Sequence, residues 1–271
     1  MTFITEIFSY GFLARAVLVG GLVSLCAAVL GVSLVLKRYS MIGDGLGHVG
    51  FGALCFAFAL NWAPIAVSMP LVALAAFVLL RVSESAKIKG DAAIGLISSS
   101  ALAAGILVAS ESGGLNIDVT GYMFGSVLSM SATDAIVGAA GCAAVLAVYA
   151  VFQGKIFAVT FDETFARAVG MKAERYNILL ALLTAVTVVI GMRIMGTLLI
   201  SSLIVFPALS AMRLGKSFRS VVIISAAVSL ICFMVGIKAA YIFSAPAGAS
   251  VVAVNAAAFG LIFILAKCRI W

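Results

Sequence analysis

The stretch GFLARAVLVGGLVSLCAAVLGVSLVLKR occupies residues 11–38, and after Arg15 it carries no charge until Lys37 and Arg38. A helix needs about 20 predominantly apolar residues to cross the hydrocarbon core of a bilayer. The stretch therefore predicts a transmembrane helix over residues 11–36 that ends at a basic pair.

The rest of the chain has the same character. Hydrophobic residues make up 65% of its 271 residues and charged residues 10%, whereas a soluble domain carries about 25% charged residues. So few charges cannot cover a water-facing surface. We therefore expect an all-α, polytopic transmembrane helix bundle of about eight or nine spans, which forms one domain over residues 1–271. The five cysteines have no CxxC spacing and are expected to be small buried hydrophobes.

Polar residues and glycines mark the expected boundaries between the spans. Residues 111–130 predict a loop followed by a short or re-entrant piece, and only Gly191-Met192-Arg193 divides the last pair before residue 213. The spans expected after the first are 42–60, 63–80, 93–110, 132–152, 177–192, 195–212, 220–237 and 248–266.

The net charge of +7 is explained by membrane topology. Nine spans with the N-terminus outside place the five most basic segments on one side, which the positive-inside rule assigns to the cytoplasm. This distribution favours membrane topology over nucleic-acid binding, and no nucleic-acid partner is expected. Arg15, Arg193 and Lys238 are exceptions near the outer side. The basic segments are 37–40, 81–92, 153–176, 213–219 and Lys267–Arg269.

The segment RYSMIGDGLGHVGFGA, residues 38–53, holds the single histidine of the chain. Asp44 and His48 are four residues apart and share one face of a helix. Counted from Arg38, His48 lies about 15 Å along a helix, near the middle of the bilayer. Ionisable residues at that depth are costly and mark a pathway or site by default. We predict that this pair lines a metal translocation path; the alternative is a buried pair that only satisfies itself.

One aspartate and one histidine do not complete a metal site, because zinc usually takes four ligands. A symmetric dimer would bring two copies of Asp44 and of His48 together near its axis. The pair is therefore expected to serve in a dimer.

The segment VTFDETFARAVGMKAERY, residues 159–176, predicts a short cytoplasmic helix at about 160–170. Thr160 and Glu163 form a capping box, and Gly170 suits the C′ position. An isolated helix of this length is marginal, so it needs support from its own protein or a partner. Asp162 and Glu163 at its start argue against anionic lipid and favour a protein partner. The apolar face is predicted to comprise Phe161, Phe165, Ala166 and Val169.

The segment GTLLISSLIVFPALSAMR, residues 196–213, contains Pro207 inside an apolar span. Proline there predicts a kink or a helix break. Ser201, Ser202 and Ser210 are available for bonds between helices. These residues support an ordinary kinked helix and a pathway helix equally.

Taken in order, these segments resemble the permease subunits of zinc and manganese ABC importers, the ABC-3 metal permease family. The family's first motif is similar to RYSMIGDGLGH, and YMFGSVL at 122–128 and PAGAS at 246–250 are also similar. The ordered set is more specific than any single motif. The cytoplasmic motif is met by Phe161, Asp162, Ala166 and Gly170, and the later one by Gly196, Leu198, Leu199, Leu203, Pro207, Ala208 and Ala211.

The resemblance implies a type II importer-like homodimer in the bacterial plasma membrane that forms one translocation path. Two nucleotide-binding ATPase subunits would dock in the cytoplasm, and an extracellular or periplasmic metal-binding protein would deliver the ion. Asp44 and His48 match family positions proposed to meet the metal. The small side chains of GDGLGHVGFG resemble zinc-type members, which favours Zn²⁺, with manganese or iron as alternatives. The residues that would couple to the ATPase are Thr160, Phe161, Asp162, Glu163, Phe165, Ala166 and Gly170.

The sequence contains no GxxxxGK[ST] phosphate-binding motif, so ATP hydrolysis is assigned to a partner chain and no enzyme activity is expected. No permanently bound cofactor is expected either. A secondary transporter or channel without an ATPase is the main alternative, but it would need a coupling chain of buried carboxylates, of which the sequence offers few. An intramembrane enzyme ranks last, because no nucleophile is placed beside Asp44 and His48.

Overall fold

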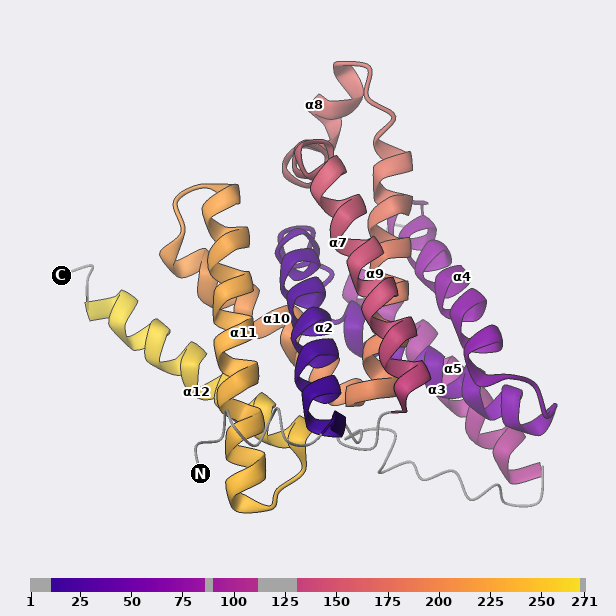
Figure 1. The fold of residues 1–271 in the computed structure, drawn as a ribbon. Helices are drawn as coiled ribbons and strands as arrows, with labels where there is room; N and C mark the ends of the chain where they lie inside the picture. The colour runs from indigo at the N-terminus through magenta and orange to yellow at the C-terminus, as the bar shows by residue number, and fades with distance from the viewer. Residues whose placement is uncertain (1–10, 86–89, 112–130, 269–271) are drawn as a thin grey trace.

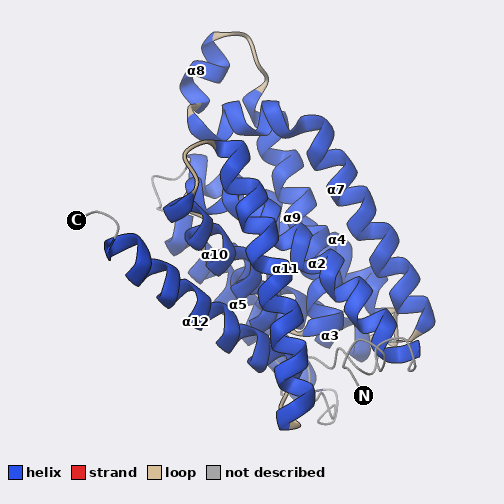
Figure 2. Ribbon diagram, turned by 60° about the vertical axis from the view of Figure 1, so that its left-hand side comes forward, coloured by secondary structure: helices blue, strands red, loops and turns tan. Residues whose placement is uncertain are grey.

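The computed structural model describes residues 11–85, 90–111 and 131–268. Within these ranges the chain forms helices joined by short connections, without a strand (Figures 1 and 2). The helices are α2 (Gly11–Leu36), α3 (Ile42–Ala59), α4 (Pro64–Ser85), α5 (Gly90–Glu111), α7 (Ala132–Phe161), α8 (Glu163–Ala168), α9 (Ala173–Met195), α10 (Thr197–Leu214), α11 (Phe218–Phe243) and α12 (Ala247–Cys268).

Eight of the described helices are long and apolar enough to cross a membrane, and α4 contains a shorter apolar stretch, Ala66–Leu79. The predicted all-α bundle of eight or nine spans is therefore confirmed. The expected re-entrant piece at 115–130 lies outside the described residues. The four cysteines whose side chains are described, Cys26, Cys55, Cys142 and Cys232, are free and buried as expected.

The short connections alternate between the two ends of the bundle. Helix α8 and the α10–α11 connection lie at one end, and the α11–α12 connection lies at the other (Figure 1). The basic segments 153–176 and 213–219 therefore share one end, which is here called the α8 end. This arrangement agrees with the sidedness expected from the basic loops.

Helix α2 is the centre of the bundle and packs against α7, α9, α10 and α11. Lipid tails are as apolar as leucine, so helices in a membrane associate through close packing and hydrogen bonds between helices. A Cβ atom at Gly31 would lie 2.2 Å from the Ile204 carbonyl oxygen of α10. The missing side chain thus allows α2 and α10 to touch backbone to backbone.

Two serine hydroxyls of α11 form hydrogen bonds to another helix in the described part of the chain. Ser225 and Ser229 donate to the carbonyl oxygens of Ala28 and Ser24 on α2, at 3.1 and 3.0 Å.

The expected bonds from the α10 serines to other helices were wrong for Ser201 and Ser202. These two hydroxyls donate to carbonyls of their own helix, those of Thr197 and Leu199. Serine inside a helix commonly bonds in this way. Helix α10 also continues through Pro207, so the helix break considered there does not occur.

Two predicted boundaries were wrong. Helix α7 runs to Phe161, nine residues beyond the expected end at 152, because Ile156 and Val159 are buried while Gly154 and Lys155 point outward. The break between α9 and α10 falls at Gly196, where φ is 87° and ψ is 159°.

Gly191, which was expected to divide these two helices, instead lies inside α9. A Cβ atom there would stand 2.6 Å from Ile200 Cδ1. This glycine therefore provides close packing between α9 and α10, and Gly196 provides the backbone turn.

Arg193, an exception to the expected charge distribution, has a partner at the end opposite α8. Its guanidinium lies 2.8 Å from a carboxylate oxygen of Asp134 in the first turn of α7. Ser131 caps α7 by accepting a hydrogen bond from the Asp134 amide at 3.1 Å. The positive charge is thus compensated locally, and it joins α7 to α9.

The contact at Gly31 predicts that Gly31→Ala lowers stability. The added methyl group must push α10 away, and such overpacking costs about 1–3 kcal/mol. Gly154, which has open space around its Cβ position in α7, provides the matched control. Gly154→Ala should be neutral or stabilise the protein by about 0.5–1 kcal/mol. Thermal unfolding of the purified variants in detergent measures both effects, and equal melting temperatures for the two would contradict the packing argument.

Candidate functional site

The helix that carries Asp44 and His48 begins later than the sequence suggested. Residues 37–41 form a turn in which Arg38 has a φ of 64° and the Tyr39 amide donates to the Leu34 carbonyl at 2.9 Å. Helix α3 starts at Ile42, so His48 lies about 9 Å along its axis. The predicted distance of about 15 Å was wrong because it counted the turn as helix, while the depth of His48 in the bilayer stays a prediction. Asp44 and His48 lie in the first half of α3, which follows the turn after α2.

The side chains of the pair face each other and stay accessible. His48 Nε2 lies 3.5 Å from Asp44 Oδ2, and the side chains are 30% and 43% exposed, respectively. Asp44 occupies the first turn of α3, where a negative charge suits the helix dipole. No group of three or more His, Cys, Asp or Glu residues that could hold a metal is found among the described residues. Completion of a metal site by two copies of the pair in a dimer stays a prediction.

Glycines set the surroundings of this pair. Cβ atoms at Gly43 and Gly47 would stand 2.8 Å from Ile204 Cδ1 and 3.0 Å from Thr197 Cγ2, so this stripe of α3 faces α10. Cβ atoms at Gly45 and Gly52 would meet Ile94 and Ala101 of α5. At about 100° per residue, positions 44 and 48 fall on the arc between these two stripes. The pair therefore lies at the margin between α10 and α5, and the helix with Pro207 packs beside it.

Helix α8 has well-formed caps at both ends. The Asp162 side chain accepts a hydrogen bond from the Phe165 amide at 2.8 Å. Gly170 has a φ of +87°, and the amides of Gly170 and Met171 donate to the carbonyls of Arg167 and Ala166. This pair of bonds is the Schellman motif, which confirms Gly170 at C′.

The predicted capping box of Thr160 and Glu163 was wrong. Thr160 belongs to α7, and its buried hydroxyl has no hydrogen-bond partner among the described residues. Asp162 takes the N-cap position because the longer α7 ends only at Phe161. The helix itself has six residues, Glu163–Ala168, and is shorter than the predicted stretch at about 160–170.

The apolar residues of this segment divide between two sides. Phe161, Phe165 and Val169 are 77%, 65% and 64% exposed, and together they form what is here called the α8 apolar surface. Ala166 is buried against Val159 and Ala173, so it does not share that face as predicted. A side chain larger than alanine would not fit between α8 and the ends of α7 and α9 without displacing them.

The α8 apolar surface continues into a row of aromatic rings. The rings of Phe161 and Phe157 are tilted against each other, with their centroids 5.8 Å apart. The ring centroid of Phe157 lies 4.6 Å from that of Phe218 at the start of α11. The row therefore joins the end of α7 to the start of α11.

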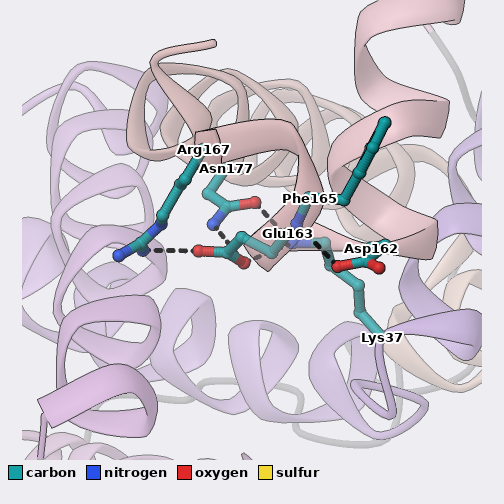
Figure 3. Close-up of polar contacts among 6 residues, drawn as sticks. All are labelled: Lys37, Asp162, Glu163, Phe165, Arg167 and Asn177. Atoms are coloured by element: carbon teal, nitrogen blue, oxygen red, sulfur yellow. Dashed lines mark hydrogen bonds and ion pairs between the residues drawn. The ribbon is translucent and has the colours of Figure 1, made fainter. Parts of the chain in front are cut away.

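Glu163 points inward and joins three other side chains (Figure 3). Its Oε2 accepts from Asn177 Nδ2 at 3.1 Å and from Lys37 Nζ at 3.4 Å, and its Oε1 accepts from Arg167 at 2.6 Å. Lys37 also donates to the Asn177 amide oxygen.

Sequence reasoning missed Lys37 and Asn177 as members of this group. In the sequence, Lys37 marks the end of the first expected span, and Asn177 marks the beginning of a later one. A separation of 126 residues between Lys37 and Glu163 leaves no local pattern by which to find the contact.

These contacts fix the charge of Glu163. Burial raises the pKa of its carboxyl group, but the hydrogen bonds from Asn177, Arg167 and Lys37 and the charge of Lys37 outweigh this effect and hold the pKa below its ordinary value. The carboxylate is therefore ionised at neutral pH.

The chain is an all-helical membrane bundle with a capped surface helix at one end. It also carries a partly exposed acid–histidine pair between α10 and α5. These features define a polytopic transport permease. The family model described as the ABC 3 transport family matches residues 9–266. The chain belongs to this family.

Relatives named for three different metals align over almost the whole chain. The manganese import system permease protein ScaB of Streptococcus gordonii is 29% identical over 97% of this chain and 95% of its own length. The high-affinity zinc uptake system membrane protein ZnuB of Haemophilus influenzae is 27% identical over 91% and 94%. A probable iron transport system membrane protein of Haemophilus influenzae is 29% identical over 98% and 97%.

A solved structure supports the same family. The structure of PsaBC from Streptococcus pneumoniae in complex with Fab superimposes with a TM-score of 0.85 at 28% identity, and it covers 96% of this chain and 94% of that chain. The arrangement of the helices is therefore that of a known transporter fold over nearly the full length.

The lowered pKa of Glu163 predicts how its contribution to stability depends on pH. Because the pKa is lower in the folded than in the unfolded protein, the contribution is complete above the unfolded pKa of about 4.3 and is lost as the pH falls through the folded pKa. The difference in melting temperature between the wild type and Glu163→Gln should stay constant from about pH 8 to 6 and shrink only in stronger acid. A difference that changes between these neutral values would contradict the assignment.

Proposed function

We propose that this chain is the membrane permease of an ATP-binding cassette importer that moves a divalent transition metal ion into the bacterial cytoplasm. The observation that carries the proposal is the α8 apolar surface: Phe161, Phe165 and Val169 are exposed on a short helix that is held firmly by its own protein. Exposed aromatic residues on an ordered element are typical of a protein–protein contact.

The proposed partner at this surface is a nucleotide-binding ATPase subunit, two copies of which serve a homodimeric permease. The described basic loops 37–40 and 213–219 lie at the same end, which is cytoplasmic under the positive-inside rule. The sequence lacks a phosphate-binding loop of its own, so the energy of ATP must enter from another chain. A metal-binding protein outside the membrane would deliver the ion to the opposite end.

The transported ion is proposed to pass Asp44 and His48. Carboxylate and imidazole are suitable ligands for zinc, and zinc prefers four ligands, which two copies of the pair would supply. The small residues of GDGLGHVGFG around the pair resemble those of zinc-type members of the family, and this resemblance favours Zn²⁺. Because relatives are named for manganese and iron, Mn²⁺ and iron remain candidates. Manganese prefers ligand sets that are richer in oxygen.

A secondary transporter or channel is the second candidate. Its support is the exposed ion pair of Asp44 and His48, which could exchange a proton during transport. Uptake of metal by this chain alone in liposomes, without ATP or another subunit, would favour it over the importer.

The α8 apolar surface predicts that Phe165→Asp prevents ATPase association. A charge buried in the contact should weaken binding by about 2 kcal/mol or more. The ATPase subunit should then no longer co-purify with this chain. Phe243 is 78% exposed at the opposite end of the bundle and provides the matched control, Phe243→Asp, which should leave co-purification unchanged. Retained co-purification with Phe165→Asp would overturn the docking role.

The position of the acid–histidine pair predicts that Asp44→Ala and His48→Ala each reduce ATP-driven uptake of Zn²⁺ or Mn²⁺ about tenfold or more, because a metal ligand is removed. The ATPase complex should still assemble and hydrolyse ATP. Phe56→Ala, on the same helix and 39% exposed, is the control and should transport normally. Normal uptake in both pair variants would remove these residues from the path.

A further inference from the structure

The group formed by Glu163, Lys37 and Asn177 lies behind the α8 apolar surface, on its inner side. The three side chains come from α8, from the turn after α2 and from α9, and they meet at one carboxylate (Figure 3). The carboxylate of Glu163 is therefore engaged within the chain, unlike the exposed rings of Phe161 and Phe165.

This group is more protected from water than an ordinary surface ion pair. The side chains of Lys37 and Glu163 are 11% and 30% exposed, and Asn177 is 4% exposed. Exposed pairs on long side chains contribute little and are screened by salt. Here the amide of Asn177 bonds to both charged partners, so the geometry of the three is defined from both sides.

Lys37 reaches α8 from a distant part of the chain. The other packing of α8 is made by Ala166 against Val159 and Ala173, which belong to the helices directly before and after it. These residues are tied to α8 by the chain itself, so their contacts do not connect α8 to a distant part of the structure. The contact from Lys37 spans 126 residues and ties α8 to the end of α2.

The end of α2 leads directly to the acid–histidine pair. Two hydrogen bonds of 3.1 Å stabilise the turn between α2 and α3. The Lys37 amide donates to the Ser33 carbonyl, and the Ile42 amide donates to the Tyr39 carbonyl. Asp44 follows Lys37 by seven positions in the sequence. A short, hydrogen-bonded turn therefore connects Lys37 to the start of α3.

We propose that Lys37 and Asn177 are positioning residues that, through Glu163, carry the displacement of α8 into α2 and α9 during the ATP-driven cycle. The inference rests on the proposed function, since it takes α8 as the site where an ATPase subunit acts. Asn177 moves α9, and Lys37 moves α2 and the start of α3, where Asp44 and His48 lie. Glu163 is thus a transmission residue, whereas Phe161 and Phe165 are contact residues.

The test uses the complex of this chain with a nucleotide-binding ATPase subunit that co-purifies with it and with a metal-binding protein that delivers the ion. Uptake of Zn²⁺ and of Mn²⁺ into liposomes is measured per ATP hydrolysed, together with subunit co-purification. Lys37→Met and Asn177→Leu keep similar volume but remove the bonds. Each should keep the ATPase bound and hydrolysing, while uptake per ATP falls about fivefold or more.

Two further variants separate transmission from structure. Lys37→Arg preserves the charge and should retain most of the uptake per ATP. Lys216 is an exposed lysine in the loop between α10 and α11 at the same end of the molecule, and Lys216→Met should match the wild type.

Three results would overturn the inference. Unchanged uptake per ATP in both Lys37→Met and Asn177→Leu would show that the group transmits nothing, and the importer assignment would stand. Loss of the ATPase subunit in these variants would make the group part of docking instead of transmission. Failure of the wild-type chain to bind any ATPase would overturn the proposed function and this inference together.

Discussion

Close contact between helix backbones is the constraint on which this structure depends. Inside a membrane the apolar side chains gain nothing by leaving the lipid, so the helices must be held by packing and by bonds between them. Helix α2 meets this requirement with Gly31 against the Ile204 carbonyl and with Ser24 and Ala28 accepting bonds from α11. Because α2 contacts four other helices, it is both the core of the fold and the element whose movement would alter the rest.

The same rule shapes the proposed path. The glycines of α3 bring that helix onto α10 on one side and α5 on the other, and they leave Asp44 and His48 on the arc between. Polar groups are costly at membrane depth unless they are partnered or open to water. Asp44 and His48 partner each other at 3.5 Å and are only partly covered by the chain's own helices, which suits the proposed passage of an ion more than tight storage.

The α8 end separates two tasks that the sequence shows as one motif. Phe161, Phe165 and Val169 are exposed for a partner, while Ala166 and Glu163 face the chain's own helices. Asp162 and Gly170 hold the short helix in shape from its two ends. An element of six residues would not persist alone, so its order depends on these caps and on the bonds to Lys37 and Asn177.

The sequence by itself determined the helical class, the approximate spans, Gly170 as a helix end and the position of Asp44 and His48 on one face, because these follow from composition and from spacing within a few residues. It placed the ends of α7 and α9 wrongly, since Ile156 and Gly191 are recognisable only by what packs against them. Only the tertiary structure revealed Lys37 and Asn177 at Glu163, and it alone showed that the serines of α11, and not Ser201 and Ser202 of α10, bond to another helix. The physical reason is that such contacts join residues far apart in the chain, and their geometry is set by how closely the helices approach.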